Sequence, residues 1–286
     1  MNMRAWKLSA LGPAWRWVGL ALLLAAGILV ALLIPRPVVG TIYLNTPIEA
    51  VSAREVIAQI DEARNNPRVR AVVLVLDSPG GTVADTEAVY LELARLRGAK
   101  PVVSTIGTMA ASGAYYLAVG SDFIFAMPTS QVGNVGVIGS LPPRPSVVED
   151  VASTGPYKLF GGPRDSFLRQ LEAVKVGFIQ AVSLGRGERL MLTTEEIARG
   201  EIYLGSDALR LGLVDALGGP SQAAAHAARM AHIAHYAVAD LRELAGLPAA
   251  TFVPFFYMAE DGRATAYPLE AGLFLLYVPP AEGRQP

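Results

Sequence analysis

The 286-residue chain has no cysteine, only three histidines and only four lysines. The absence of cysteine excludes disulfide bonds and thiolate metal sites, although it does not identify a cellular compartment. The formal net charge of −1 leaves no excess of basic residues of the kind that nucleic-acid-binding proteins present. We therefore expect no nucleic acid among the partners of this protein.

The scarcity of histidine also limits the metal sites and catalytic triads that the chain can form. All three, His226, His232 and His235, lie in one alanine-rich stretch that is predicted to be helical over 221–235. His232 and His235 share a helical face, but a zinc site needs a third ligand that the sequence does not identify. A Ser–His–Asp triad is allowed in principle, because triads are defined by geometry, yet these histidines fall outside the predicted core. We expect neither a metal nor a cofactor.

One long uncharged run stands out, the 18 residues from Trp17 to Ile34. As a helix it would span about 27 Å, close to the ~30 Å hydrocarbon core of a bilayer. Pro35 and Pro37 would end that helix. The alternative is a cleaved signal peptide, but the run is longer than a signal-peptide core and no A-x-A-like site follows it. We therefore expect a retained single-pass membrane anchor.

The charges that flank this run predict its orientation. Arg4, Lys7 and Arg16 precede it, whereas only Arg36 follows it closely. By the positive-inside tendency the N-terminus is cytoplasmic and the remainder lies outside, at the cell membrane. The expected organisation has three parts: a cytoplasmic end with the anchor at 1–38, a folded domain at 39–238 and a tail of unknown role at 239–286.

Strand patterns and helix patterns alternate after the anchor at intervals of about 30 residues. Residues 71–76 form a continuous apolar run, which is typical of a strand that is covered on both faces. Apolar helical faces follow over 84–97 and 165–184. This alternation predicts an α/β domain with a largely parallel sheet. In the tail, the apolar runs at 252–257 and 271–278 are too short to span a bilayer and could pack on the domain, on another subunit or on the membrane surface.

A serine among small residues is the first candidate for chemistry. Ser112 follows an apolar strand and precedes a segment that can start a helix, and Gly107, Ala110, Ala111 and Gly113 leave little bulk around it. A buried turn of this kind lets another backbone come close, and the free N–H groups of a helix start can stabilise negative charge. The alternative is that Ser112 is simply an N-cap.

A serine nucleophile needs a base, and a lysine that burial keeps neutral can provide one. Lys7 lies beyond the anchor, Lys100 enters a strand in a polar turn, and Lys175 can pair with Glu172 on a helix. Lys158 lies instead among apolar and aromatic residues, where removal from water would lower its pKa. The alternative for Lys158 is a side chain that extends to the surface.

Two glycine-containing segments complete the candidate site. Gly80 and Gly81 end a strand in a sharp turn, where their N–H groups can face a ligand oxygen as in an oxyanion hole. A plain tight turn is the alternative. A second segment suits an extended strand that pairs with a bound peptide. Its candidate substrate-binding residues are Gly133, Asn134, Val135, Gly136 and Val137.

Five motifs occur together in one order along the chain. They are LDSPGG at 76–81, MAASGAYY at 109–116, GNVGVIG at 133–139, GPYK at 155–158, and GEIYLG at 200–205 with LGLVD at 211–215. This series resembles the signal peptide peptidase A family of membrane-anchored serine peptidases over roughly residues 39–235. The resemblance implies a β-α superhelix of the Clp-protease/crotonase type with a mostly parallel sheet. The Pro142–Pro145 linker and the tail depart from the family pattern.

The resemblance also implies roles for these residues. Ser112 would be the nucleophile and Lys158 its general base, with the N–H of Gly113 and one from Gly80 or Gly81 holding the oxyanion. The family assembles into homo-oligomeric rings or domes with internal active sites, and it degrades leftover signal peptides and other small or unfolded chains. We expect this chain to do the same.

Three other functions stay open on the sequence. One is a related membrane protease of the nodulation-efficiency class, which shares the fold and dyad but cuts a specific membrane partner. Another is acyl-CoA processing on a crotonase fold, although the usual glutamates are not evident near the glycine turns. The third is a catalytically silent scaffold that organises a membrane complex.

Overall fold

The computed structural model describes residues 13–33, 36–140, 152–155, 157–158, 161–249, 256–258, 264–266 and 273–276. The chain divides into two compact units, Met1–Arg36 and Pro37–Pro286. The described element of the first unit is helix α1 (Pro13–Leu33). Within the described ranges, no helix is both long enough and apolar enough to cross a membrane. The predicted anchor therefore rests on the sequence alone.

The second unit is built around one sheet, in which six strands follow the order β10-β1-β2-β4-β5-β9 and every neighbouring pair is parallel. These strands are β1 (Val38–Leu44), β2 (Val69–Ser78), β4 (Val102–Ala111), β5 (Phe123–Ala126), β9 (Ala216–Leu217) and β10 (Ala237–Asp240). Strand β6 (Gln131–Gly133) pairs in parallel with the end of β4, and β8 (Ile202–Leu204) pairs antiparallel with β6. The prediction of a largely parallel sheet is confirmed.

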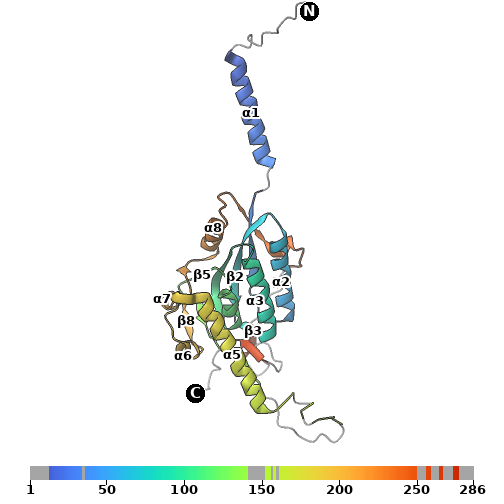
Figure 1. Ribbon diagram of the computed structural model, residues 1–286, viewed down its shortest axis with the longest axis vertical. Helices are drawn as coiled ribbons and strands as arrows, with labels where there is room; N and C mark the ends of the chain where they lie inside the picture. Colours follow the sequence, from blue (N-terminus) through green and yellow to red (C-terminus); the bar gives the residue numbers. More distant parts are fainter. Residues whose placement is uncertain are drawn as a thin grey trace, which may run out of the picture. The chain divides into compact units, whose positions relative to one another are not determined.

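Helices cover both faces of this sheet, which explains the continuous apolar run of β2 (Figure 1). On one face, α2 (Ala50–Asn65), α3 (Val83–Arg97), α4 (Gly113–Ala118) and α5 (Arg164–Arg186) contribute to the main core. On the other face, α8 (Pro220–Met230) lies close to the strands because its buried side chains are alanines. Successive residues of β2 therefore pack into different cores. Val72 and Leu74 belong to the core on the first face, and Val73 belongs to the core on the second.

Shorter elements complete the domain. The helical ones are η1 (Gly187–Arg189), α6 (Thr194–Ile197), α7 (Gly205–Arg210) and α9 (Leu241–Leu244). A three-stranded sheet contains β3 (Gly80–Thr82), β13 (Leu273–Leu276) and β7 (Ile138–Gly139), and a hairpin pairs β11 (Phe256–Met258) with β12 (Ala264–Ala266).

The helix predicted over 221–235 is shorter than expected. It ends at Met230, and His232 adopts a φ of 55°, a left-handed conformation that does not continue a helix. His232 and His235 therefore do not share a helical face. His226 remains on α8, where its ring stacks on Phe123 with centroids 4.0 Å apart.

A buried ion pair joins α5 to the strands. Arg186 and Asp215 have side chains that are only 2% and 4% exposed. The guanidinium donates to both carboxylate oxygens, at 2.9 and 2.7 Å, and its Nε donates to the carbonyl of Gly212 at 2.7 Å. Asp215 also accepts the N–H of Ile124 in β5 at 2.8 Å. This network fixes the end of α5 against the edge of the sheet.

Asp215→Asn should destabilise the domain by about 3–5 kcal/mol, because it leaves the buried Arg186 guanidinium without a countercharge. Asp207→Asn is the matched control, since Asp207 pairs with Arg210 on the exposed surface and should change stability by about 0.5 kcal/mol or less. Urea unfolding followed by far-ultraviolet circular dichroism measures both. Equal unfolding midpoints for the two variants would contradict the assigned role of the pair.

The same carboxylate predicts a pH dependence. Burial alone would raise the pKa of Asp215, but the hydrogen bonds and charge of Arg186 outweigh burial and lower it. A carboxyl whose pKa is lowered by folding stabilises the protein above its unfolded pKa of about 4 and loses that contribution as the pH falls toward the folded pKa. The stability difference between the wild type and Asp215→Asn should therefore shrink below about pH 4, which urea unfolding at a series of acidic pH values measures. A constant difference down to about pH 2 would count against this assignment.

Candidate active site

Ser112 lies at the junction between the central strand β4 and helix α4. It is 1% exposed, and its backbone has a φ of 52° and a ψ of −119°, in a region that residues other than glycine rarely adopt. Its N–H donates to the carbonyl of Gly133 at 2.8 Å, and its carbonyl accepts the N–H of Tyr116 at 2.9 Å. Strain of this kind costs about 1–3 kcal/mol and is concentrated at functional sites.

The side chain of Ser112 does not have the structural role that its position allows. Ser112 occupies the N-cap position of α4, yet its hydroxyl makes no capping hydrogen bond to that helix. Among the described residues, no other hydrogen bond uses this hydroxyl. The interpretation of Ser112 as a side-chain N-cap is therefore wrong, and its hydroxyl is left available for chemistry.

The following two tyrosines hold α4 in place. The Tyr115 hydroxyl donates to the carbonyl of Leu213 at 2.8 Å, and burial raises the pKa of this phenol. Tyr116 packs between Tyr90 of α3 and Phe178 of α5, with ring centroids 4.7 and 5.0 Å away. The first residue of α4, Gly113, is buried and directly follows Ser112, as an oxyanion-hole donor would.

The glycine turn is held by Ile48 on one side. The N–H of Ile48 donates to the carbonyl of Gly80 at 2.8 Å, and the N–H of Thr82 donates to the carbonyl of Ile48 at 2.9 Å. A Cβ on Gly81 would lie 1.8 Å from the Ile48 carbonyl oxygen, and Gly80 has a φ of 98°, so both positions require glycine. The N–H of Gly80 donates to the hydroxyl of Ser78 at 3.3 Å.

The five candidate substrate-binding residues have different surroundings. The carbonyl of Gly133 accepts the N–H of Ser112. The backbone N–H of Asn134 donates to the carbonyl of Glu201, and its side-chain amide donates to the carbonyl of Gly200, each at 2.8 Å. Val135 is buried. Gly136 has open space where a Cβ would lie, and Val137 is partly buried. Gly133 and Asn134 thus support Ser112, and the segment beyond them leads to β7.

Lys158 is exposed and lies in a turn, where its backbone N–H donates to Gly155 at 3.2 Å. Within the described part of the chain, no hydrogen bond joins its ammonium to Ser112, so the structure does not bring the predicted dyad together. The described lysines other than Lys158 are engaged elsewhere. Lys100 donates to the carbonyls of Ala63 and Asn66 at 2.5 and 2.8 Å, and Lys175 forms the predicted ion pair with Glu172 at 2.7 Å. Lys7 lies outside the described residues.

Sequence reasoning missed the role of Asp77, which directly precedes the glycine turn. Its carboxylate accepts the N–H of Met109 at 3.2 Å and so connects the ends of β2 and β4 beside Ser112. The order Asp77-Ser78-Pro79-Gly80-Gly81 in the sequence was the available signal.

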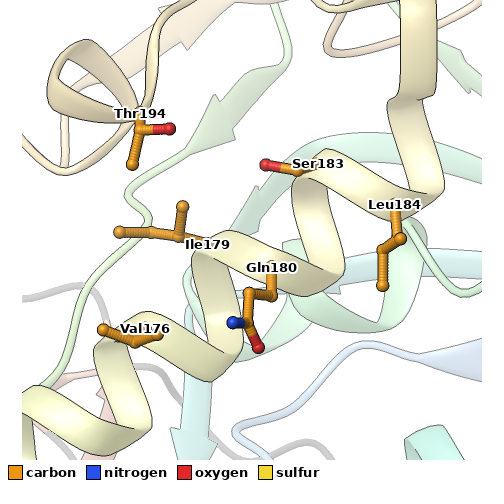
Figure 2. A pocket seen from close by; sticks show the side chains of 6 residues that line it. All are labelled: Val176, Ile179, Gln180, Ser183, Leu184 and Thr194. Carbon is orange, nitrogen blue, oxygen red and sulfur yellow. The ribbon is translucent and has the colours of Figure 1, made fainter.

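A pocket of about 500 Å³ is lined by α5 and α6 and contains none of the predicted site residues (Figure 2). Five of its lining residues come from α5 and one from α6: Val176, Ile179, Gln180, Ser183, Leu184 and Thr194. Ser112 and the Gly80–Gly81 turn lie elsewhere, at the carboxyl ends of β4 and β2, where open α/β sheets bind their ligands.

Comparisons with known proteins identify relatives of this chain. Residues 94–234 match the model of peptidase family S49, and residues 38–133 match the model of Clp protease. Protease 4 of Salmonella typhi is 34% identical over 190 residues, which are 62% of this chain and 31% of that protein. The chloroplastic serine protease SPPA of Arabidopsis thaliana is 30% identical over 204 residues, 66% of this chain and 30% of that protein.

Protease 4 of Haemophilus influenzae is 29% identical over 199 residues, which are 64% of this chain and 32% of that protein. The chain thus spans about a third of the length of these relatives. Its sheet and the two family models together identify the fold as Clp-protease-like. The chain belongs to the signal peptide peptidase A family of serine peptidases, peptidase family S49.

Proposed function

We propose that this protein is a membrane-anchored serine endopeptidase in which Ser112 is the nucleophile and Lys158 its general base. The observation that carries the proposal is the conformation of Ser112. It is buried and strained at the end of the central strand, and its hydroxyl takes no capping role. Such strain persists only where the surrounding structure enforces it, as the bond to Gly133 does here.

The reaction proceeds in two steps. Lys158 accepts the Ser112 proton as the serine oxygen adds to a peptide carbonyl, and the oxyanion is held by the N–H of Gly113 and one from Gly80 or Gly81. The intermediate then collapses: the C–N bond breaks, the departing amine takes the proton from Lys158, and the acyl group remains attached to Ser112 as an ester. Water then gives a proton to Lys158, adds to the ester carbon and releases the acid, and Ser112 recovers its proton.

Catalysis requires the Lys158 side chain to leave its exposed position and reach Ser112. The other described lysines support this assignment, since Lys100 is bound to backbone carbonyls and Lys175 is paired with Glu172. Lys158 is thus the described lysine without a competing structural role.

The proposed substrates are leftover signal peptides and other small or unfolded chains. Val135, Gly136 and Val137 would pair with an extended peptide, and the valine-rich surround favours small or aliphatic side chains next to the cleaved bond. The anchor from Trp17 to Ile34 would place the catalytic domain outside the cytoplasm, in a homo-oligomeric ring.

Ser112→Ala and Lys158→Ala should each lower hydrolysis of an unstructured peptide by roughly 1,000-fold or more, because the nucleophile and its base act as one unit. Lys175→Ala is the matched control and should keep near wild-type activity, since Lys175 only pairs with Glu172. A fluorogenic peptide assay measures the rates, and far-ultraviolet circular dichroism checks the fold. The dyad is wrong if the Lys158 variant is as active as the Lys175 variant.

The predicted topology can be tested with the full-length chain in a bacterial host. A protease added to spheroplasts should degrade an epitope tag placed at the C-terminus, whereas the tag should be protected in inverted membrane vesicles until detergent is added. The physical reason is the excess of positive charge before the apolar run. Protection in spheroplasts, or extraction of the protein by alkaline carbonate, would contradict the anchor or its orientation.

A further inference from the structure

A segment from the end of the chain lies beside the candidate active site. Strand β13 lies between β3 and β7 and pairs antiparallel with both, so it joins these two strands into one sheet. It is the short red strand beside β3 in Figure 1. Strand β3 contains the two candidate oxyanion glycines, and β7 directly follows the candidate substrate-binding segment.

The backbone of β3 is arranged to bind a strand in this position. The backbone of Ile48 forms hydrogen bonds with the carbonyl of Gly80 and with the N–H of Thr82. The backbone N–H and C=O groups of successive residues in a strand point to opposite sides. The N–H and C=O of Gly81 therefore face away from Ile48. In the register of the β3–β13 pair, Leu275 lies directly opposite Gly81.

The same register aligns the rest of β13 along the glycine turn. Leu276 lies opposite Gly80, and Phe274 lies opposite both Thr82 and Ile138. Strand β13 also lies against α4, the helix that begins directly after Ser112. An extended peptide whose carbonyl approached the Gly80–Gly81 turn would need the place that β13 occupies.

We propose that the C-terminal strand β13 is a built-in competitor of peptide substrates, which fills the strand position between β3 and β7 (the groove, below) until a peptide displaces it. The proposal rests on the proposed function, because it assigns this groove to the substrate of Ser112. Strand β13 pairs through its backbone, as an added peptide strand would, and its sequence Leu273-Phe274-Leu275-Leu276 is wholly apolar. We therefore expect the competing peptides to be extended and apolar.

The covalent link makes this short strand an effective competitor. A tethered segment has an effective concentration in the millimolar range, so even a weak four-residue strand can hold its site against dilute peptide. The apparent affinity for an added peptide falls in proportion to the fraction of molecules whose groove is free. A tail that is bound nine-tenths of the time would weaken peptide binding about tenfold.

The test uses full-length Ser112→Ala protein in detergent, which does not depend on catalysis. The probe is a fluorescein-labelled peptide with the sequence of residues 270–281, and its binding is followed by fluorescence anisotropy. Leu275→Pro in this background removes the N–H that faces Gly81 and should tighten probe binding about tenfold. Ala281→Pro is the matched control, a proline in the same tail but outside β13, and it should leave binding unchanged.

A second variant distinguishes the loss of β13 from misfolding caused by the proline. A chain that ends at Ala271 lacks β13 without introducing a proline, and it should show the same gain, with circular dichroism confirming the fold of each protein. Equal probe affinity in the Leu275→Pro, Ala281→Pro and shortened proteins would overturn the proposal.

Activity measurements on the chain with Ser112 intact separate this inference from the proposed function. If both hold, Leu275→Pro lowers KM for an added peptide and leaves kcat unchanged. Tighter binding without any hydrolysis would refute the peptidase and leave the competitor role standing. Hydrolysis with the same KM in the Leu275→Pro and Ala281→Pro proteins would refute the competitor and leave the peptidase standing.

Discussion

The hydrogen bond from the Ser112 N–H to the Gly133 carbonyl, 2.8 Å long, is the contact on which the candidate site depends. It ends the pairing of β4 with β6 and holds Ser112 at a positive φ, where a residue other than glycine is strained. Without it, Ser112 could relax to an ordinary N-cap conformation and its hydroxyl could bond to the start of α4.

Several other contacts secure the partner of that bond. Asn134 attaches the end of β6 to Gly200 and Glu201, and β8 pairs with β6 from the outer side. On the opposite side of Ser112, the Tyr115 hydroxyl ties α4 to Leu213. The buried Arg186–Asp215 pair fixes the end of α5 to β5, the strand next to β4. The strain at Ser112 is thus supported by contacts from residues far apart in the sequence.

Much of the sheet could be predicted from the sequence because its signals are local. The apolar run at 71–76 and the helical face at 84–97 correspond to β2 and α3, since burial on both faces and a single apolar stripe each leave a distinct pattern. The predicted ends of helices and strands were less accurate than the predicted elements themselves. The helix predicted over 221–235, for example, ends at Met230, because His232 adopts a left-handed conformation that does not continue it.

Contacts between distant residues were not predictable. The sequence showed an apolar run at 271–278 that was too short for a membrane span, but nothing in its pattern identified β3 and β7 as its partners. Arg186 and Asp215 are 29 positions apart, and only the fold shows that they meet. For the candidate site, the sequence identified Ser112 by the small residues around it, while its strained backbone and missing cap bond could be found only in three dimensions.

The central claim is that Ser112 is a nucleophile activated by Lys158. The most direct measurement is mass-spectrometric mapping of the protein after reaction with a fluorophosphonate, which forms a covalent bond with activated serines. The account predicts one adduct, on Ser112, that is lost in Lys158→Ala and kept in Lys175→Ala. An adduct on another serine, or equal labelling of Ser112 in the two lysine variants, would contradict it.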